Sequence, residues 1–312
     1  MKIIFWGKGS RGESSLKALV NMFDVLSIVI EPNHKERNNE IIEIANKYKI
    51  DILSPNNPNN NNTSKLLKSY GADIFILAGY GKILKQNIID IPTIMSINLH
   101  GGKLPDYRGS SPMNWALING ENKFSISIIK LDSGVDTGDI LIEKSINISS
   151  NDTIADLHKK ANREFVIALI KLINNLKNSI KTKRKQNKNL GSYYSIRRPE
   201  DGFVLWEFLK AEDIHNRIRA LTEPYPFAFS YLKKKKVFLV KSELKETLFI
   251  GEPGRIYRIS KKKGLLVGAS DKCLWIKEAV YADTKVSILD QVQRYDRFAR
   301  IQDLFDQLYS DE

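Results

Sequence analysis

The sequence of 312 residues predicts an α/β protein, in which a doubly wound, mainly parallel sheet is followed by a small second domain of β type. Three observations predict this class. Short apolar runs alternate with helical patterns over the first part of the chain. A basic stretch poor in apolar residues, 177–190, then breaks the composition. Beyond it, short apolar runs are separated only by turns.

The first part of the chain carries apolar runs typical of buried strands, with amphipathic stretches between them. Because strands that alternate with helices form crossover units, the sheet should be parallel and Rossmann-like. The Asn- and Pro-rich stretch 55–62 should be a loop. The expected strands are 2–6, 25–30, 74–78, 94–98, 126–131 and 140–148, and the expected helices are 14–22, 39–48, 64–70 and 153–176.

The last third of the chain predicts a β-barrel of OB-like type. Its short apolar runs lie close together and are separated by Gly- and Lys-containing turns. A polar stretch at 286–309 should form a helical tail. We expect a catalytic domain at 1–180, a linker at 181–205 and the barrel domain with its tail at 206–312. The expected strands here are 237–240, 254–259, 265–267 and 273–276.

Composition narrows the classes of function. No run of 18 apolar residues occurs, so no membrane partner is expected, and the single Cys273 cannot form an internal disulfide; both favour the cytoplasm. The net charge of +13 lies largely in lysine runs, which are mostly solvated and lack interleaved aromatic residues. The preferred interpretation therefore has no nucleic-acid partner. No metal is expected, because the four histidines are scattered: His34, His100, His158 and His215.

A glycine-rich loop follows the first strand and opens a helix. Gly7-Lys8-Gly9-Ser10-Arg11-Gly12 matches the dinucleotide-binding pattern, and Glu31 ends the second strand, where a ribose-binding carboxylate would lie. Free N–H groups at a helix N-terminus bind anions in general. Three interpretations stay open here: an NAD site, a site for another phosphate group, and a purely structural turn.

A second set of residues has the chemistry of acyl transfer to an amine. Asn98 offers an N–H donor for an oxyanion, His100 can donate or carry a proton, and Asp136 can orient the imidazole or accept a proton. Asn98 and His100 are two residues apart at a strand end, so both side chains point to one side of the sheet. Taken singly, His100 could be a structural histidine and Asp136 a turn former.

The segment 98–138 resembles the folate-dependent formyltransferases. It contains Asn-x-His, then Leu-Pro-x-Tyr-Arg-Gly at 104–109, then Asp-x-Gly-x-Asp-Thr-Gly at 132–138. The resemblance implies that Asn98, His100 and Asp136 are catalytic and that 10-formyltetrahydrofolate is the formyl donor. It also implies a wall of the folate pocket at 78–84. The residues expected at the donor are Gly79, Tyr80, Gly81, Lys82, Ile83, Gly134 and Thr137.

Within this family, the sequence is most similar to enzymes that formylate the amine of a nucleotide-linked amino sugar. Asn114-Trp115 stands where the methionyl-tRNA formyltransferases have Ile-Gln-Arg, and the short stretch 31–39 lacks their basic insertion. A C4 amine and synthesis of O-antigen or lipopolysaccharide are implied by this resemblance. The residues expected at the acceptor are Gly9, Ser10, Arg11, Tyr107, Arg108, Gly109, Tyr194, Arg197 and Arg198.

Other functions stay open at this point. A methionyl-tRNA formyltransferase is the main alternative, followed by an NAD-dependent enzyme and by a binding protein without catalysis. Retention of all three expected catalytic residues argues against the last. The sequence identifies neither the base of the nucleotide nor the sugar. A homodimer could form through 237–249 and the tail.

Overall fold

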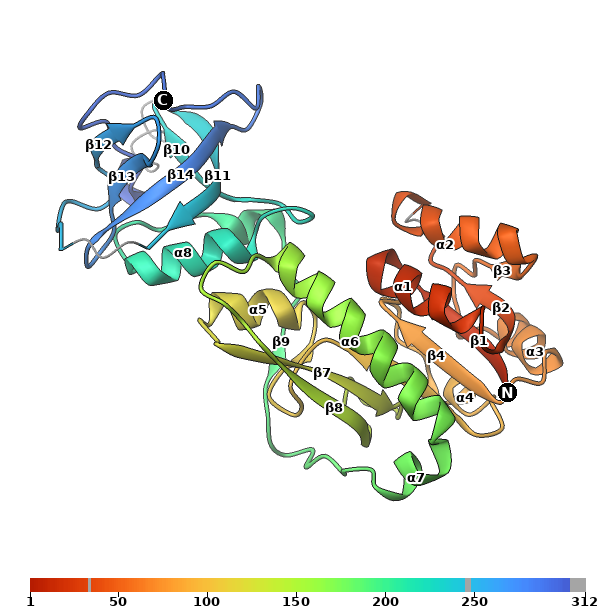
Figure 1. Cartoon of the computed structure of the whole chain (residues 1–312). Coiled ribbons are helices and arrows are strands. Elements are labelled where there is room, and N and C mark those ends of the chain that lie inside the picture. The colour runs from red at the N-terminus through yellow and green to blue at the C-terminus, as the bar shows by residue number, and fades with distance from the viewer. Residues whose placement is uncertain (33–34, 245–247, 304–312) are drawn as a thin grey trace. The chain divides into compact units, whose positions relative to one another are not determined.

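A computed structural model of the chain describes residues 1–32, 35–244 and 248–303, and these residues form two compact units (Figure 1). The first unit comprises Met1–Pro112, Lys123–Asn147 and His158–Ser195. The second unit comprises Met113–Asn122, Ile148–Leu157 and the chain from Ile196 onward. The domain boundaries expected from the sequence, with a linker at 181–205, stay a prediction.

The first unit is built on a seven-stranded sheet in the order β3-β2-β1-β4-β5-β7-β8. Strands β1 to β5 are parallel, whereas β7 runs antiparallel to β5 and to β8, so the expected α/β fold with a mainly parallel sheet is confirmed. Its elements are β1 (Lys2–Gly7), α1 (Gly9–Leu19), β2 (Asp24–Val29), α2 (Lys35–Tyr48), β3 (Asp51–Leu53), α3 (Asn61–Ser69), β4 (Ile74–Ala78), α4 (Gln86–Ile89), β5 (Met95–His100), β6 (Arg108–Gly109), β7 (Lys123–Lys130), β8 (Ile140–Asn147), α7 (Leu176–Lys181) and β9 (Tyr193–Tyr194).

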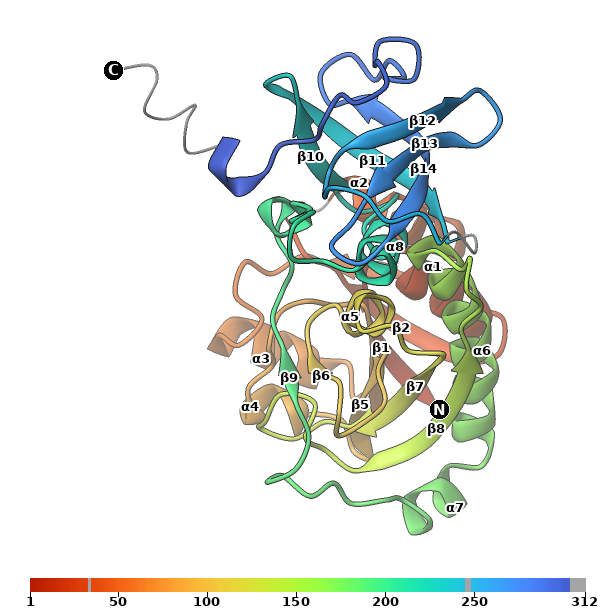
Figure 2. The same ribbon diagram turned by 90° about the vertical axis from the view of Figure 1, so that its left-hand side faces the viewer.

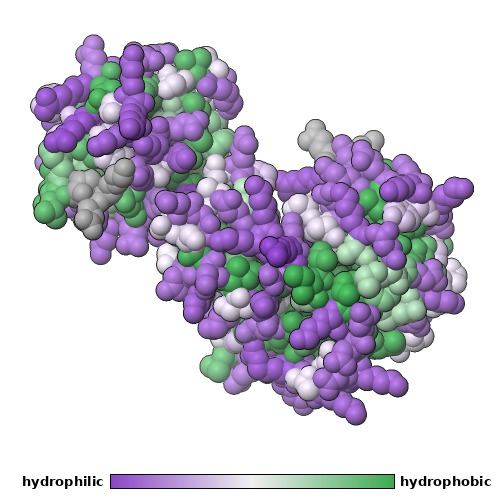
Figure 3. All heavy atoms as spheres, in the orientation of Figure 1, coloured by the Kyte–Doolittle hydropathy of each residue, from purple (hydrophilic) through white to green (hydrophobic). Residues whose placement is uncertain are grey.

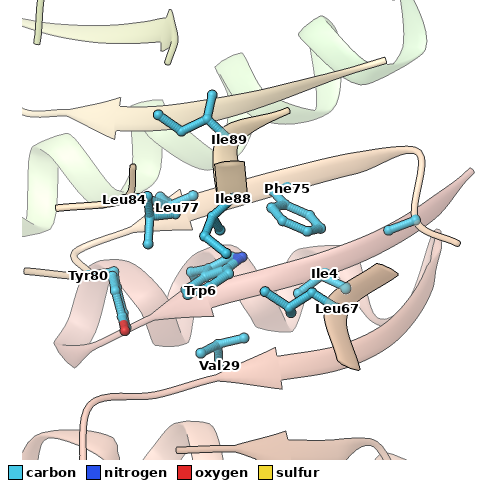
Figure 4. Packing of buried hydrophobic residues seen from close by; sticks show 11 residues of the cluster. Ile4, Trp6, Val29, Leu67, Phe75, Leu77, Tyr80, Leu84, Ile88 and Ile89 are labelled. Carbon is cyan, nitrogen blue, oxygen red and sulfur yellow. The ribbon is translucent and has the colours of Figure 1, made fainter. Parts of the chain in front are cut away.

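The centre of this sheet is buried on both faces. Ile3, Ile4, Phe5 and Trp6 of β1 have no exposed surface, as expected for a continuous apolar run in a parallel strand. Figure 4 shows the Trp6 side chain among residues of β4 and the helices that cover it. Its ring contacts that of Tyr80 edge-on at 5.1 Å between centroids. This packing holds the carboxyl ends of β1 and β4 beside each other, where ligands bind in such sheets.

Two helices contain residues of both units: α5 (Pro112–Ile118) and α6 (Ile154–Asn174). Figures 1 and 2 show α6 running beside β8. Phe165, Leu169 and Leu172 are fully buried on the part of α6 within the first unit, at the spacing of one helix face. The sequence expected this helix at 153–176, and its apolar periodicity explains the agreement.

The second unit contains α8 (Ala211–Ala220) and a five-stranded antiparallel sheet in the order β10-β11-β14-β13-β12. A short 3-10 helix, η1 (Pro199–Gly202), precedes α8. Trp206 has only 1% of its surface exposed and stacks on Phe298, with 5.1 Å between the ring centroids. The strands are β10 (Ala228–Leu232), β11 (Lys235–Glu243), β12 (Ile256–Ser260), β13 (Gly264–Gly268) and β14 (Cys273–Tyr281).

The expected helical tail at 286–309 is wrong for the residues that the structure describes, and residues 304–309 lie outside them. Segment 286–300 is extended or turned, and only 301–303 begin a helix. Ile256 N–H donates to Asp296 O, and Ala299 N–H donates to Tyr231 O. The segment thus pairs with both edge strands of the sheet, β12 and β10. Unpaired edge groups and a buried Phe298 outweigh the helical propensity of the polar sequence.

Hydrophilic residues predominate on the face of each unit seen in Figure 3. Among the described helices, none combines the length and the apolar character that crossing a membrane requires.

Candidate active site

Strand β5 presents Asn98 and His100 at the carboxyl edge of the sheet. Leu77 of β4 pairs with Asn98 on one side, and Ser127 of β7 pairs with His100 on the other. The strand was expected to end at Asn98, but it continues through His100 because β7 supplies a further partner. Both side chains therefore start from rigid backbone and point to the same side.

The Asp136 carboxylate lies at the centre of the site. Its Oδ2 accepts the Gly109 N–H at 3.0 Å and lies 3.5 Å from His100 Nδ1. Its Oδ1 lies 3.4 Å from the Asn98 side-chain nitrogen. The structure thus brings together Asn98, His100 and Asp136, the three residues that the sequence singled out for chemistry.

The second nitrogen of His100 restricts where protons can reside. Nε2 lies 2.6 Å from the carbonyl oxygen of Tyr107. Since a carbonyl oxygen only accepts hydrogen bonds, Nε2 must carry a proton. Nδ1 then faces a carboxylate, and this contact is favourable only if a proton lies on Nδ1 or on Asp136.

Tight backbone geometry keeps this arrangement in place. Asp136 itself has a left-handed backbone, with φ of 52°, a conformation that costs energy for a residue with a side chain. A Cβ on Gly102 would lie 2.8 Å from His100 Nε2, and one on Gly109, whose φ is +91°, would lie 2.4 Å from Tyr194 O. The absence of a side chain lets Gly102 approach the imidazole closely and lets Gly109 approach the Tyr194 backbone closely.

The turn 132–138 is closed by its own first residue. Asp132 Oδ1 accepts the Thr137 hydroxyl at 2.6 Å and the Gly134 N–H at 3.1 Å, and Lys188 lies 2.9 Å from Oδ2. Burial raises the pKa of Asp132, but the hydrogen bonds from Thr137, Lys188 and Gly134 together bring it below its ordinary value. Thr137 and Gly134, expected at the donor, thus shape the turn; their contact with the donor stays a prediction.

The expected folate wall is tied to the glycine-rich loop by a buried ion pair. Glu31 Oε1 accepts the Gly81 N–H at 2.6 Å and lies 2.8 Å from Lys8 Nζ. Glu31 is only 6% exposed, so it serves this internal contact and not a ribose. An NAD site at this loop would therefore lack the carboxylate that was expected to bind the ribose.

The side chains of the wall divide into buried and exposed ones. Tyr80 packs in the core, and burial raises the pKa of its hydroxyl, with a further contribution from Glu31. Lys82 Nζ donates to Asn56 O at 2.7 Å. Ile83 is 67% exposed, and Gly79 has φ of +80°. Of these side chains, that of Ile83 is therefore the exposed one, and the contact of this segment with the donor stays a prediction.

Arg11, in the first turn of α1, holds strand β5. Its Nη1 donates to Leu99 O at 2.9 Å, and its guanidinium lies 4.9 Å from the centre of the Phe165 ring. Ser10 accepts a hydrogen bond from Asn162 at 3.0 Å. Burial, and then the charge of Arg11, lowers the pKa of His158 to about 4. His158 and Asn162 were missed from the sequence because only the tertiary fold brings α6 to this loop.

The expected acceptor residues at 107–109 and 194 lie together, but one of them needs correction. The Tyr107 and Tyr194 rings stack with 4.9 Å between centroids, and β6 pairs with β9 beside them (Figure 2). Arg108 is 0% exposed, and its guanidinium donates to the Gln186 side chain and to Asn187 O and Leu190 O. Because it is buried and engaged, Arg108 is a structural residue and not a contact for the acceptor.

Arg197 and Arg198 belong to the second unit. The Arg197 guanidinium lies 4.8 Å from the Trp115 ring centre and donates to Asp201 O at 2.7 Å, as does that of Arg217. Burial, followed by repulsion from Arg217, lowers the pKa of Arg197. Arg198 is exposed. Arg217 was missed because its position on α8 carried no motif.

The described residues contain no group of three or more His, Cys, Asp or Glu side chains that could hold a metal ion.

Comparison with known proteins agrees with this geometry. The chain matches the family described as formyl transferase over residues 23–173 and its C-terminal domain over residues 197–293. It is 32% identical over 294 residues to a methionyl-tRNA formyltransferase of Ruminiclostridium cellulolyticum, which covers 91% of this chain and 93% of that protein. It is 35% identical over 292 residues to the bifunctional polymyxin resistance protein ArnA of Wigglesworthia glossinidia brevipalpis, covering 92% of this chain and 44% of that one.

Solved structures share the fold. An N-formyltransferase from Helicobacter canadensis, in complex with folinic acid and dTDP-3-aminofucose, aligns with a TM-score of 0.67 at 21% identity, covering 88% of this chain and 98% of its own. A 4-N formyltransferase from Francisella tularensis aligns with a TM-score of 0.63 at 20% identity, covering 79% and 98%. Three polar residues gather at the edge of the sheet, and the matches extend along most of the chain. The chain therefore belongs to the formyltransferase family and is a formyltransferase.

Proposed function

We propose that this enzyme transfers the formyl group of 10-formyltetrahydrofolate to the C4 amine of a nucleotide-linked amino-dideoxy sugar, for polysaccharide synthesis of the O-antigen or lipopolysaccharide type. The convergence of Asn98 and His100 on the Asp136 carboxylate carries the chemical part of the proposal. Similarity in fold to a sugar 3N-formyl transferase, and to an N-formyltransferase in complex with dTDP-3-aminofucose, supports the sugar acceptor.

The reaction assigns a task to each of the three residues. The neutral amine attacks the formyl carbon, and the carbonyl oxygen becomes an oxyanion. Asn98 has a second amide proton that can stabilise this oxyanion, and a protonated His100 places positive charge nearby. The bond between the formyl carbon and N10 of the folate then breaks. The proton lost by the amine passes through the His100–Asp136 pair to N10, so a formamide and tetrahydrofolate are formed.

The wall at 79–83 fits a flat, polar-edged ring such as a pterin. The exposed Ile83 offers an apolar surface to one face of such a ring. The stacked Tyr107 and Tyr194 are proposed at the acceptor together with Gly9, Ser10 and Gly109. Arg197, beside Trp115, is proposed for the phosphates of the nucleotide together with the exposed Arg198.

The acceptor is tested by comparing candidate acceptors in separate reactions. The enzyme is incubated with 10-formyltetrahydrofolate and, separately, with dTDP-, UDP- and GDP-linked 4-amino sugars and with methionyl initiator tRNA. We expect one nucleotide sugar to be formylated, as detected by a mass increase of one formyl group. Matched 3-amino sugars control for the position of the amine. Formylation of the tRNA alone would overturn the proposed acceptor while leaving the formyltransferase activity intact.

A methionyl-tRNA formyltransferase is the second candidate, because two observations favour it. Curated relatives at 30–32% identity carry that name. In addition, lysines of the second unit lie over aromatic rings: Lys236 Nζ is 3.8 Å from the Phe229 ring centre, and Lys285 Nζ is 4.3 Å from that of Phe238. The sequence suggested no aromatic residues beside the lysine runs, and the pairing of β10 with β11 places them there.

A further inference from the structure

We propose that residues 183–190, here called the strap, position the catalytic carboxylate, and that Gln186 is the positioning residue through which they act. The sequence offered no role for this basic stretch. The inference goes beyond the choice of acceptor, since it concerns the formyl-transfer site that either acceptor would use.

Gln186 uses both protons of its side-chain amide on the turn that carries Asp136. Its Nε2 donates to the backbone oxygen of Asp136 at 2.8 Å and to that of Gly138 at 2.7 Å. These two oxygens flank Thr137, so one side chain holds both ends of the tightest part of the turn. The position of the Asp136 backbone, and hence of its carboxylate, is therefore set from the strap.

Arg108 determines which way the Gln186 amide points. Its Nε and Nη2 lie 3.3 and 3.0 Å from Gln186 Oε1. A guanidinium only donates, so the oxygen of the amide must face Arg108 and the nitrogen must face the turn. Arg108 is 0% exposed and also donates to Leu190 O at 3.0 Å. The buried arginine thus fixes both the rotamer of Gln186 and the path of the strap.

Ion pairs on either side of Gln186 hold the strap along the turn. Lys183 lies 2.6 Å from Asp139, and Lys188 lies 2.9 Å from Asp132. Arg184 exchanges two backbone hydrogen bonds with Ile140 at the start of β8. Partly exposed ion pairs contribute little individually, so we assign the positioning itself to the half-buried Gln186 amide.

The turn needs such support because Asp136 adopts a left-handed backbone, with φ of 52°. Strained conformations persist when surrounding contacts over-determine them. Without the two hydrogen bonds from Gln186, the turn can relax and move the carboxylate away from His100 and from the Gly109 N–H.

The test uses two variants of the full chain. Gln186→Met keeps the length of the side chain and removes its hydrogen bonds. Gln186→Glu keeps an acceptor for Arg108 but sets a carboxylate against two carbonyl oxygens. For both, we expect kcat to fall by about 10²-fold with little change in the KM of the donor, because a displacement of about 1 Å costs that much. Thr182→Val, which removes one hydrogen bond to Asn178 just before the strap, should retain wild-type kcat.

A double-mutant comparison separates positioning from general stability. In an Asp136→Asn background, Gln186→Met should cause little further loss, since residues that act through one another are not additive. An equal loss in both backgrounds would overturn the proposal, as would wild-type kcat in Gln186→Met.

A further measurement needs no acceptor, so it is independent of the proposed function. The Gly109 N–H donates to Asp136 Oδ2, whereas the neighbouring Ser110 N–H donates to Tyr194 O. In Gln186→Met, hydrogen exchange at Gly109 should accelerate while Ser110 stays protected. Unchanged exchange at Gly109 would show that the carboxylate keeps its place without Gln186 and would contradict the proposal.

Discussion

At the scale of single residues, the proposed chemistry depends on one carboxylate with three different partners. Asp136 meets an amide side chain, an imidazole and a backbone N–H, with each donor nitrogen 3.0 to 3.5 Å away. Contacts of this length are typical of a site that tightens only when substrate binds. In the proposed mechanism, the carboxylate therefore links the oxyanion donor Asn98 to the proton carrier His100.

Removing either member of the proton-carrying pair should abolish most turnover. We expect His100→Ala and Asp136→Asn each to lower kcat by about 10²- to 10⁴-fold. Binding of the folate, followed by thermal shift, should persist because neither residue is proposed to hold the pterin. Asp106→Asn is the control, since Asp106 lies in the same loop and pairs with Lys103. Turnover near that of the wild type in His100→Ala would contradict the assignment.

His158 makes stability depend on pH. Burial and Arg11 lower its pKa to about 4 in the folded protein, against the ordinary 6.5. As pH falls, the unfolded chain therefore binds a proton on His158 before the folded protein does. The folded state loses stability between about pH 6.5 and about pH 4. By pH 5 the loss should reach about 2 kcal/mol.

The control for this effect is His158→Gln, which stays polar but cannot titrate. Melting temperatures of the two proteins are compared at pH 7 and pH 5. The wild type should lose more than the variant on acidification. An identical pH response in both would show that His158 is not held neutral by the fold.

At the scale of secondary-structure elements, short strand pairings hold the loops of the site. β6 and β9 contain two residues each, yet their pairing places Gly109 against Tyr194 and brings the Tyr107 carbonyl to His100. Pairings of this length are marginal alone, so their stability comes from the stacked tyrosines and the buried Arg108 beside them.

Gly109→Ala should disrupt this pairing. Its φ is +91°, and the added Cβ would lie 2.4 Å from Tyr194 O, so both the backbone and the neighbouring strand must shift. We expect a loss of stability of about 1–3 kcal/mol together with reduced kcat. Gly71→Ala is the matched control, because Gly71 has φ of +60° with nothing within 4 Å. Equal effects of the two substitutions would contradict the close approach.

The extended segment 286–300 closes the second unit, and its anchor is Phe298. This side chain is fully buried and stacks on Trp206. Phe298→Ala should lower the free energy of unfolding by about 3–5 kcal/mol, as measured by chemical denaturation. Tyr295→Ala, in the same segment but 54% exposed, should cost much less. A mild effect of Phe298→Ala would mean that the edge hydrogen bonds hold the segment without it.

At the scale of the whole molecule, the net charge of +13 is compatible with either acceptor. The dependence of the KM on salt concentration distinguishes the two. A tRNA held through six or more phosphates loses about 10³-fold in affinity as salt rises from about 50 mM to about 200 mM. A nucleotide sugar has only two phosphates. We therefore expect the KM of the acceptor to change far less over this range, as measured by initial rates. A steep rise in KM would favour the tRNA candidate.

Local sequence patterns predicted much of the fold and the residues at the centre of the site. The alternation of apolar runs predicted the parallel sheet, and the two-residue spacing of Asn98 and His100 predicted their common side. The tail at 286–309 was misjudged, because pairing with two edge strands overrode the local helical pattern in its described part. Arg108 was misplaced at the acceptor, because nothing near it in the sequence reveals that its partners are on the strap.

The sequence by itself determined the residue types proposed for the chemistry and the strand that carries two of them, because these follow from short-range spacing. The resemblance of segment 98–138 to known enzymes indicated the family. Only the tertiary structure decided which groups hold the carboxylate in place. Gln186 is 50 residues from Asp136 and 78 from Arg108, and Arg11 is 88 from Leu99. Contacts over such separations depend on how the elements pack, and no local pattern encodes them.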